Sequence, residues 1–209
     1  MPGITRLYRN HYYAMRHGQS QANLEGVIVS DPEKGTTGYG LTESGKHQAR
    51  ESARSFRVVA AKLHIYSSDF LRAQETASLV HCILQPPFEV TLSVLLRERF
   101  FGELEGHIDS AYQDVWSLDA INPNNKQRGV ESVTSVLNRA TELLENLESR
   151  YRGENILLVA HGDVLQILQT TFERVPPSQH RQMPHLQVAE IRRLNPPLFG
   201  RASPTHSST

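Results

Sequence analysis

Short apolar segments that alternate with longer amphipathic segments constrain the fold of this chain most strongly. The clearest apolar segment, residues 155–160 (NILLVA), is typical of a buried strand. The segment before it, residues 132–151, repeats apolar residues with the 3.6-residue period of a helix. Because parallel strands are joined by helical crossovers, the alternation predicts an α/β fold, a three-layer sandwich with a mostly parallel central sheet flanked by helices.

The other expected elements continue this alternation. Further strands are predicted at 11–15, 63–67, 88–92 and 187–194, and further helices at 43–59, from 68 or 69 to 84, at 109–118 and at 163–174. We expect one domain over residues 1–194. The Pro- and Ser-rich stretch 195–209 is expected to be a disordered tail.

The composition argues against several classes of protein. The 22 Lys and Arg balance the 22 Asp and Glu, and nucleic-acid-binding proteins usually carry a basic surplus. No apolar stretch approaches the roughly 20 residues that span a bilayer. The single cysteine, Cys82, allows no internal disulfide framework and is expected to fill the core from a helix. With a polar start and no signal-like apolar segment, we expect a cytoplasmic protein that binds neither nucleic acid nor membrane.

Two predicted strands end on a His-Gly pair. His17-Gly18 follows the first strand, directly after Arg16, and His161-Gly162 follows the strand at 155–160. In open parallel sheets, ligands bind beyond the carboxyl ends of the strands, so we expect the two imidazoles to meet there. Arg72 falls in the first turn of the next helix after another strand and is expected at the same end. The alternative is that these are ordinary turn histidines and a solvated arginine.

A metal site is the competing interpretation of the same residues. His161 and Asp163, with His17 as a third ligand, make an incomplete ligand set. Arg16 and Arg72 beside them would repel a cation. We therefore predict no bound metal and no cofactor.

Six motifs occur in the order and spacing of one known family. They are Arg16-His17-Gly18-Gln19-Ser20-Gln21-Ala22-Asn23, a Leu41-Thr42 helix start with Gly45 and Gln48-Ala49, Ser67-Ser68-Asp69-Phe70-Leu71-Arg72-Ala73-Gln74-Glu75-Thr76-Ala77, Leu96-Arg97-Glu98 with Gly102 and Glu105-Gly106, Gly129-Val130-Glu131-Ser132, and Val159-Ala160-His161-Gly162. Over residues 11–194 the chain resembles the histidine phosphatase superfamily, also called the phosphoglycerate mutase-like family.

The resemblance implies a role for each matching residue. His17 would be the nucleophile that is transiently phosphorylated, and Glu98 the general acid that protonates the leaving oxygen. The remaining implied roles concern the phosphoryl oxygens and the substrate: Arg16, Arg72 and His161 as catalytic groups, and Asn23, Ser20, Gly162 and Phe101 as substrate-binding residues. No metal or cofactor is required, because guanidinium groups neutralise the phosphate.

The family contains both phosphatases and mutases. Only 63 residues separate Glu98 from His161, which resembles the short, broad-specificity phosphatases, and that segment offers only Lys126 and Arg128 as candidates to bind a second anion. Phe101 stands where mutases tend to have tyrosine. The side chains of Phe100, Phe101, Tyr112 and Trp116 are expected either to form an apolar pocket wall or to fill the core beneath a lid. We therefore predict a monomeric or homodimeric phosphomonoester hydrolase acting on a small phosphorylated metabolite. A cofactor-dependent phosphoglycerate mutase-type phosphotransferase and a catalytically weak binding or regulatory protein are the alternatives.

Overall fold

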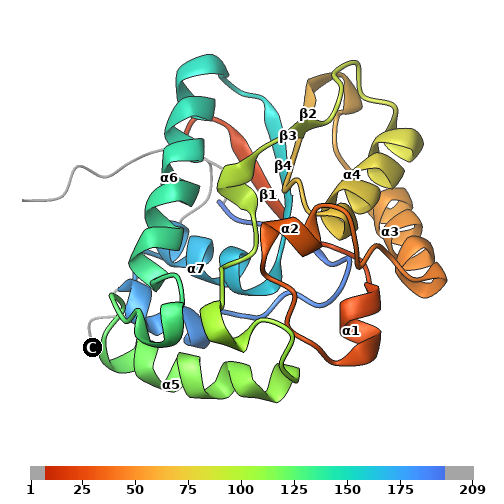
Figure 1. Ribbon diagram of the computed structural model, residues 1–209. Helices are drawn as coiled ribbons and strands as arrows, with labels where there is room; N and C mark the ends of the chain where they lie inside the picture. The colour runs from red at the N-terminus through yellow and green to blue at the C-terminus, as the bar shows by residue number, and fades with distance from the viewer. Residues whose placement is uncertain (1–7, 196–209) are drawn as a thin grey trace, which may run out of the picture.

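The central sheet has five strands in the order β3-β2-β4-β1-β5 (Figure 1). The computed structural model describes residues 8–195. The strands are β1 (His11–Arg16), β2 (Leu63–Ser67), β3 (Thr91–Leu92), β4 (Asn155–Ala160) and β5 (Ile191–Arg193). All neighbouring pairs are parallel except β1 with β5, which is antiparallel. The predicted mostly parallel sheet is confirmed.

Seven α-helices occur within residues 8–195. They are α1 (Gln21–Glu25), α2 (Pro32–Gly35), α3 (Glu43–Ser55), α4 (Leu71–Leu84), α5 (Tyr112–Ile121), α6 (Val133–Arg150) and α7 (Gly162–Glu173). Short 3₁₀ helices lie at Ala60–Lys62, Val94–Leu96, Gly102–Leu104, Asp109–Ala111, Gln127–Gly129 and Pro177–Gln182. None of the helices in this part of the chain is long and apolar enough to cross a membrane.

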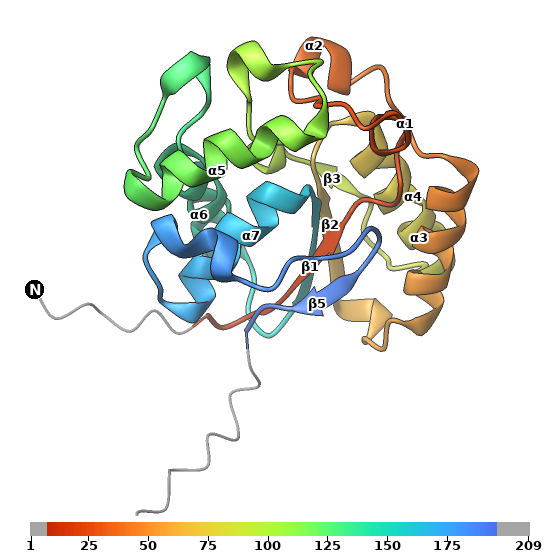
Figure 2. The ribbon, with the colours of Figure 1, turned by 90° about the horizontal axis from the view of Figure 1, so that it is seen from below.

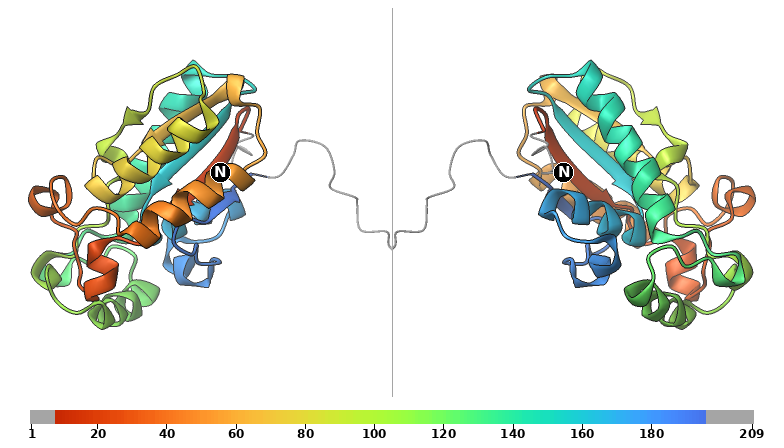
Figure 3. Two further views of the ribbon diagram at one scale, coloured as in Figure 1. Left: turned by 90° about the vertical axis from the view of Figure 1, so that its right-hand side faces the viewer. Right: turned by 90° about the vertical axis from the view of Figure 1, so that its left-hand side faces the viewer.

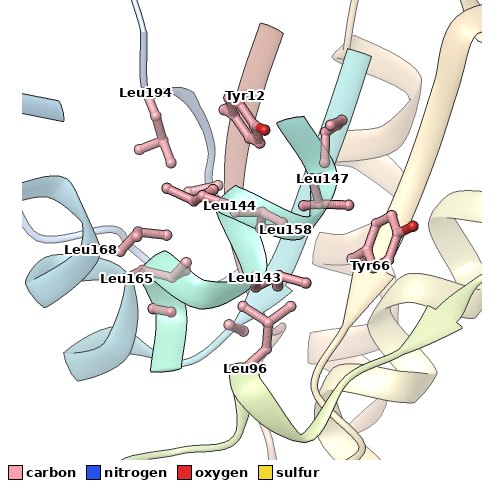
Figure 4. Close-up of a cluster of buried hydrophobic side chains, with 14 of the residues drawn as sticks. Tyr12, Tyr66, Leu96, Leu143, Leu144, Leu147, Leu158, Leu165, Leu168 and Leu194 are labelled. Carbon is pink, nitrogen blue, oxygen red and sulfur yellow. The ribbon is translucent and has the colours of Figure 1, made fainter. Parts of the chain in front are cut away.

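Alternate residues of the middle strands serve opposite faces of the sheet. In β4, Ile156 and Leu158 pack with α6 and α7 in one buried cluster, shown in Figure 4. Leu157 and Val159 pack with α3 and α4 in a second cluster. Figures 1 and 2 show these two helix pairs on opposite sides of the sheet. Burial on both faces explains the unbroken apolar sequence of β4 and confirms the three-layer sandwich.

One end of the sheet carries additional structure. Figure 3 shows the red-orange α1 and the green α5 beyond the same end of the sheet. Bonds between distant segments hold α1 there, since Asp109 N donates to Gly26 O at 2.8 Å and Val27 bridges Ile108. The β1–α1 and β4–α7 connections leave the sheet at this end, which places both His-Gly pairs beneath α1 and α5.

Several predicted boundaries are wrong. The helix predicted at 43–59 ends at Ser55, and Phe56 is extended with φ −75° and ψ 113°. The strand predicted at 88–92 is reduced to its last two residues, because Phe88 instead stacks on His64 with ring centroids 4.2 Å apart. The last strand covers only Ile191–Arg193 rather than 187–194. Helices α1 and α2, each of five residues or fewer, were not predicted.

Cys82 is exposed, which corrects its prediction as a core residue. Helix α4 buries the stripe formed by Ala73, Thr76, Ala77 and Val80, and a residue two positions beyond Val80 points to the opposite side of the helix. The tail predicted to be disordered at 195–209 lies, apart from its first residue, outside the described residues.

Candidate active site

The two predicted histidines meet at the end of the sheet. Parallel β1 and β4 pair Arg16 with Ala160, so the next residues, His17 and His161, leave the sheet side by side. Their ring centroids lie 5.2 Å apart with the rings inclined by 62°. Both side chains are buried. The predicted convergence of the imidazoles is confirmed.

The hydrogen bonds of His17 assign its tautomer. Its Nδ1 lies 2.8 Å from the Gly18 carbonyl oxygen, which can only accept, so Nδ1 carries the proton. Its Nε2 then holds a lone pair and accepts from Arg72 Nε at 3.1 Å. Burial, aided by Arg72 and Arg16, holds the pKa of His17 well below its ordinary value. His17 is therefore neutral near pH 7, with an unprotonated Nε2 whose lone pair faces Arg72.

Two guanidinium groups line the same cavity as His17. Arg16 Nη1 lies 2.7 Å from His185 Nε2 and also donates to the Leu186 carbonyl at 3.2 Å. Arg72 Nη2 donates to the Val29 carbonyl at 3.0 Å. Arg16 Nε and Arg72 Nη1 are buried and have no hydrogen-bond partner among residues 8–195. Two buried cationic donors without a protein partner suit the oxygens of an anion such as phosphate.

Glu98 lies between His161 and Arg72. Its Oε2 is 3.9 Å from His161 Nδ1 and 4.0 Å from Arg72 Nη2, and its Oε1 accepts from the Arg99 amide at 3.0 Å. Burial raises the pKa of Glu98 to about 7, although Arg72 acts in the opposite direction. The carboxyl group can therefore hold a proton near neutral pH.

His161 lies beneath the cavity surface rather than on it. Its Nε2 is 2.9 Å from Ser68 Oγ, and its Nδ1 has no hydrogen-bond partner in the described chain. Burial, followed by the effect of Arg72, lowers the pKa of His161 well below its ordinary value. The ring therefore presents one unpartnered nitrogen toward Glu98.

A cavity of about 390 Å³ opens above these groups. Its lining includes the predicted residues Arg16, His17, Arg72, Glu98, Ser20, Asn23 and Gly162. Gly162 lies directly against two side chains of the lining, because a Cβ at this position would lie 3.2 Å from His185 Cε1, a tight contact, and 3.4 Å from Arg16 Nε, an ordinary one. The arrangement combines a neutral nucleophilic nitrogen, two fixed cations and a protonatable carboxyl group around one cavity.

Comparison with known proteins agrees with this geometry. The family model of the histidine phosphatase superfamily (branch 1) matches residues 12–198. The chain belongs to the histidine phosphatase superfamily. It is 30% identical over 176 residues to phosphoglycerate mutase-like protein 4 of Arabidopsis thaliana, covering 80% of this chain and 71% of that protein.

Relatives within the superfamily carry different activities in their names. A 2,3-bisphosphoglycerate-dependent phosphoglycerate mutase of Methylocella silvestris is 27% identical over 186 residues, covering 84% of this chain and 85% of the relative. The fold matches that of a mycobacterial glucosyl-3-phosphoglycerate phosphatase in complex with VO3, with a TM-score of 0.70, 22% identity and coverage of 87% and 90% of the two chains. Membership of the superfamily therefore leaves the choice between mutase and phosphatase open.

Phe101 does not line the cavity, which corrects its prediction as a substrate-binding residue. It has no exposed surface and packs with Ile28, Leu104 and Val115 in a small core beneath α5. The Tyr112 ring lies edge-on to it at 4.6 Å. Tyr112 therefore separates Phe101 from the cavity.

Ser20 and Asn23 line the cavity but also support each other. They form a capping box, in which Asn23 N donates to Ser20 Oγ at 3.3 Å and Ser20 N donates to Asn23 Oδ1 at 3.1 Å. Their contribution to substrate binding stays a prediction, as do the catalytic roles of the other residues.

Four residues of the site were not predicted from sequence. Asp109, Arg181 and His185 line the cavity, and Ser68 holds the ring of His161. Of these four residues, only Ser68 could have been found from the sequence, because it lies in the same family motif as Arg72. Asp109 and Arg181 lie in short 3₁₀ helices and His185 in the loop that follows the second of these, and the position of all three depends on the folded chain.

Two further observations concern the charged residues near Glu98 and the grouping of metal-ligating side chains. Arg97 pairs with Asp69 at 2.6 Å and Arg99 with Asp119 at 2.6 Å, so neither neighbour neutralises the Glu98 carboxyl group. Within residues 8–195, no group of three or more His, Cys, Asp or Glu side chains is arranged to hold a metal ion.

Proposed function

We propose that this protein is a metal-independent phosphomonoester hydrolase that acts through a phosphohistidine at His17 on a small phosphorylated metabolite. The observation that carries the proposal is the tautomer of His17. Its Nδ1 proton is engaged by the Gly18 carbonyl and its Nε2 lone pair faces Arg72. A neutral nucleophile beside fixed cations meets the requirements for attack on a phosphate ester.

In the first step, His17 Nε2 attacks phosphorus, and a P–N bond forms as the ester P–O bond breaks. The free N–H groups of Arg16 and Arg72 bind the phosphoryl oxygens. His161, neutral with its proton on Nδ1 and its Nε2 accepting from Ser68 Oγ, directs that N–H toward the charge that develops in the transition state. Glu98 gives its proton to the departing oxygen, so the leaving group departs as an alcohol.

In the second step, water attacks the phosphorus of phosphohistidine. The Glu98 carboxylate accepts one proton of this water, so that oxygen bonds to phosphorus as the P–N bond breaks. Inorganic phosphate leaves, His17 regains its lone pair, and Glu98 is again protonated. The pKa of about 7 suits Glu98 to both steps.

The charges around the cavity favour hydrolysis over the mutase reaction, in which the phosphoryl group is transferred back to a sugar acid. No Lys or Arg between Glu98 and His161 lines it, so this segment supplies no cation for a substrate carboxylate. Arg128 is half-exposed and lies 3.8 Å from Glu103 instead.

A phosphatase assay with p-nitrophenyl phosphate in the presence of EDTA tests the proposal. We expect turnover to persist with the chelator and to fall by at least about 10³-fold in His17→Ala, because the nucleophile is lost. Acid-quenched wild-type enzyme should carry phosphate on His17. His47→Ala, which removes an exposed histidine of α3, is the matched control and should keep activity within about twofold.

Other outcomes would support the competing functions. Dependence on an added metal ion would indicate a metallohydrolase. Formation of 2-phosphoglycerate from 3-phosphoglycerate with 2,3-bisphosphoglycerate would indicate a mutase. Absence of turnover with every phosphomonoester would favour a binding or regulatory protein.

A further inference from the structure

The cavity lining contributed by α5 and the segments around it differs in charge from the floor formed around His17. Arg16 and Arg72 form the floor around His17. A second part of the lining, here called the outer wall, consists of Val27, Asp109, Tyr112, Trp116, Asp163 and Arg181. The leaving group of a bound phosphomonoester would contact this wall, because the phosphoryl group occupies the floor.

Aromatic rings make the outer wall rigid. Tyr112 and Trp116 stack with centroids 5.3 Å apart and an interplanar angle of 13°. The guanidinium of Arg181 also lies over the Trp116 ring, 3.5 Å from its centroid. Trp116 Nε1 donates to Asp163 Oδ1 at 3.1 Å. The wall is therefore assembled before a substrate binds and offers ring edges rather than adaptable polar chains.

The cation of the outer wall is already paired. Arg181 Nη1 lies 3.7 Å from Asp163 Oδ1 and donates a short hydrogen bond to Gln166 Oε1. His185, at the boundary with the floor, adds no positive charge, because burial and the nearby Arg16 lower its pKa. Neither group offers a free cation to a second anion on the substrate.

Asp109 adds an unpaired negative charge to this wall. Its side chain is exposed, lines the cavity and has no hydrogen bond or ion pair within the described part of the chain. Its backbone is fixed by the bond from Asp109 N to Gly26 O and by the adjacent bridge between Val27 and Ile108. The backbone that carries this carboxylate is therefore fixed beside the cavity.

We propose that the outer wall selects phosphomonoesters whose leaving group is planar or apolar and carries no second anion, with Asp109 and Trp116 as specificity-determining residues. This inference rests on the proposed function for the position of the phosphoryl group. Asp109 repels a carboxylate or second phosphate on the leaving group, while Trp116 and Val27 contact a flat or apolar surface.

Two esters of matched shape test the charge selection. The substrates 4-carbamoylphenyl phosphate and 4-carboxyphenyl phosphate differ by an amide in place of a carboxylate. We expect wild-type kcat/KM to favour the amide by at least about tenfold, and Asp109→Asn to reduce that preference by about three- to tenfold. Asp114→Asn, an exposed α5 carboxylate outside the cavity, should leave it within about twofold.

Trp116→Leu tests the aromatic part of the wall. We expect kcat/KM for 4-carbamoylphenyl phosphate to fall at least about tenfold, and that for glycerol 3-phosphate to change less than about threefold, because the smaller alcohol has no ring to contact. Equal losses for the two substrates would overturn the role of Trp116 in selection.

A binding measurement separates this inference from the proposed function. The non-hydrolysable pair 4-carbamoylbenzylphosphonate and 4-carboxybenzylphosphonate is titrated into wild-type protein by calorimetry. A protein that hydrolyses neither ester yet binds the amide phosphonate more tightly would overturn the hydrolase and support the selection. A protein that hydrolyses both esters with equal kcat/KM, or prefers the carboxylate, would overturn the selection and keep the hydrolase.

Discussion

Glu98 is surrounded by groups that act on its proton in opposite directions. Burial raises its pKa to about 7, whereas Arg72, 4.0 Å away, and the Arg99 amide stabilise the carboxylate. The same residue can therefore give a proton in one step and accept one in the next. Small changes in these contacts would shift the pKa of Glu98 and therefore the pH at which it exchanges its proton.

The pH dependence of kcat/KM tests this assignment. With phenyl phosphate, whose leaving group is poor, we expect kcat/KM to fall about tenfold per pH unit above about pH 7, because the protonated form of Glu98 is lost. His17 adds no fall between pH 7 and 6.5, since its pKa is lowered and the ring stays neutral. In Glu98→Gln, kcat/KM should drop by about 10²-fold or more, and the fall above pH 7 should disappear.

The good leaving group of p-nitrophenyl phosphate serves as the control. It needs little protonation, so Glu98→Gln should slow its first step far less than that of phenyl phosphate. If kcat/KM of Glu98→Gln still fell above pH 7, the ionisation responsible for the fall would belong to another group.

Helices α5 and α7 are joined by a buried arginine. Arg99 has no exposed surface and donates to Asp119 of α5 at 2.6 Å and 2.9 Å, and to Asp163 of α7 at 3.2 Å. Its Nε donates to the Glu131 carbonyl at 2.7 Å. Because Asp163 also holds Trp116, this one side chain connects the cavity wall to the body of the sandwich.

Removing this cation should destabilise the protein strongly. We expect Arg99→Met to lower the free energy of unfolding by about 3–5 kcal/mol, because Asp119 is left buried without its partner. Urea denaturation measures the change, followed by circular dichroism and by the fluorescence of Trp116, the only tryptophan of the chain.

A second substitution separates lost pairing from lost packing. Arg99→Met combined with Asp119→Leu removes the orphaned carboxylate and should recover at least half of the loss. A loss below about 1 kcal/mol in the single variant would contradict the proposed connection.

The stability of the whole molecule depends on pH through its buried imidazoles. Burial lowers the pKa of both His17 and His161, while in the unfolded chain each imidazole titrates near its ordinary value. Between these pKa values the unfolded chain binds more protons than the native protein, so native stability falls as pH falls below about 6.5. Glu98, whose pKa is raised, acts oppositely and loses its contribution as pH rises toward about 7.

His161→Asn isolates one of these contributions. We expect wild type to lose about 1.4 kcal/mol of stability relative to this variant for each pH unit below 6.5, until the native pKa is reached. Denaturant unfolding of both proteins at pH 7, 6 and 5 measures the difference. The pH-independent cost of the substitution cancels in the slope, and parallel curves would contradict the buried, neutral state of His161.

The sequence predicted the chemistry of the floor better than the boundaries of the elements. His17 and His161 follow strands whose apolar pattern is plain, and Arg72 lies in the first turn of a predicted helix, so the parallel sheet brings all three together. The helix predicted to reach residue 59 stops at Ser55 because Phe56 is extended and packs beside Val58 on the second core cluster. The periodicity of apolar residues therefore does not predict a helix end that is determined by packing of an extended segment.

The amino-acid sequence by itself determined the α/β sandwich and the position of two imidazoles and two guanidiniums at one sheet end, because strand periodicity and motif spacing are local properties. Only the tertiary structure decided that Phe101 lies under Tyr112 and that Asp109 and Arg181 reach the cavity. The neutral state of His17 was decided there too. These features depend on burial and on contacts between distant segments. Neither burial of a polar group nor a long-range contact produces a repeating pattern in the sequence.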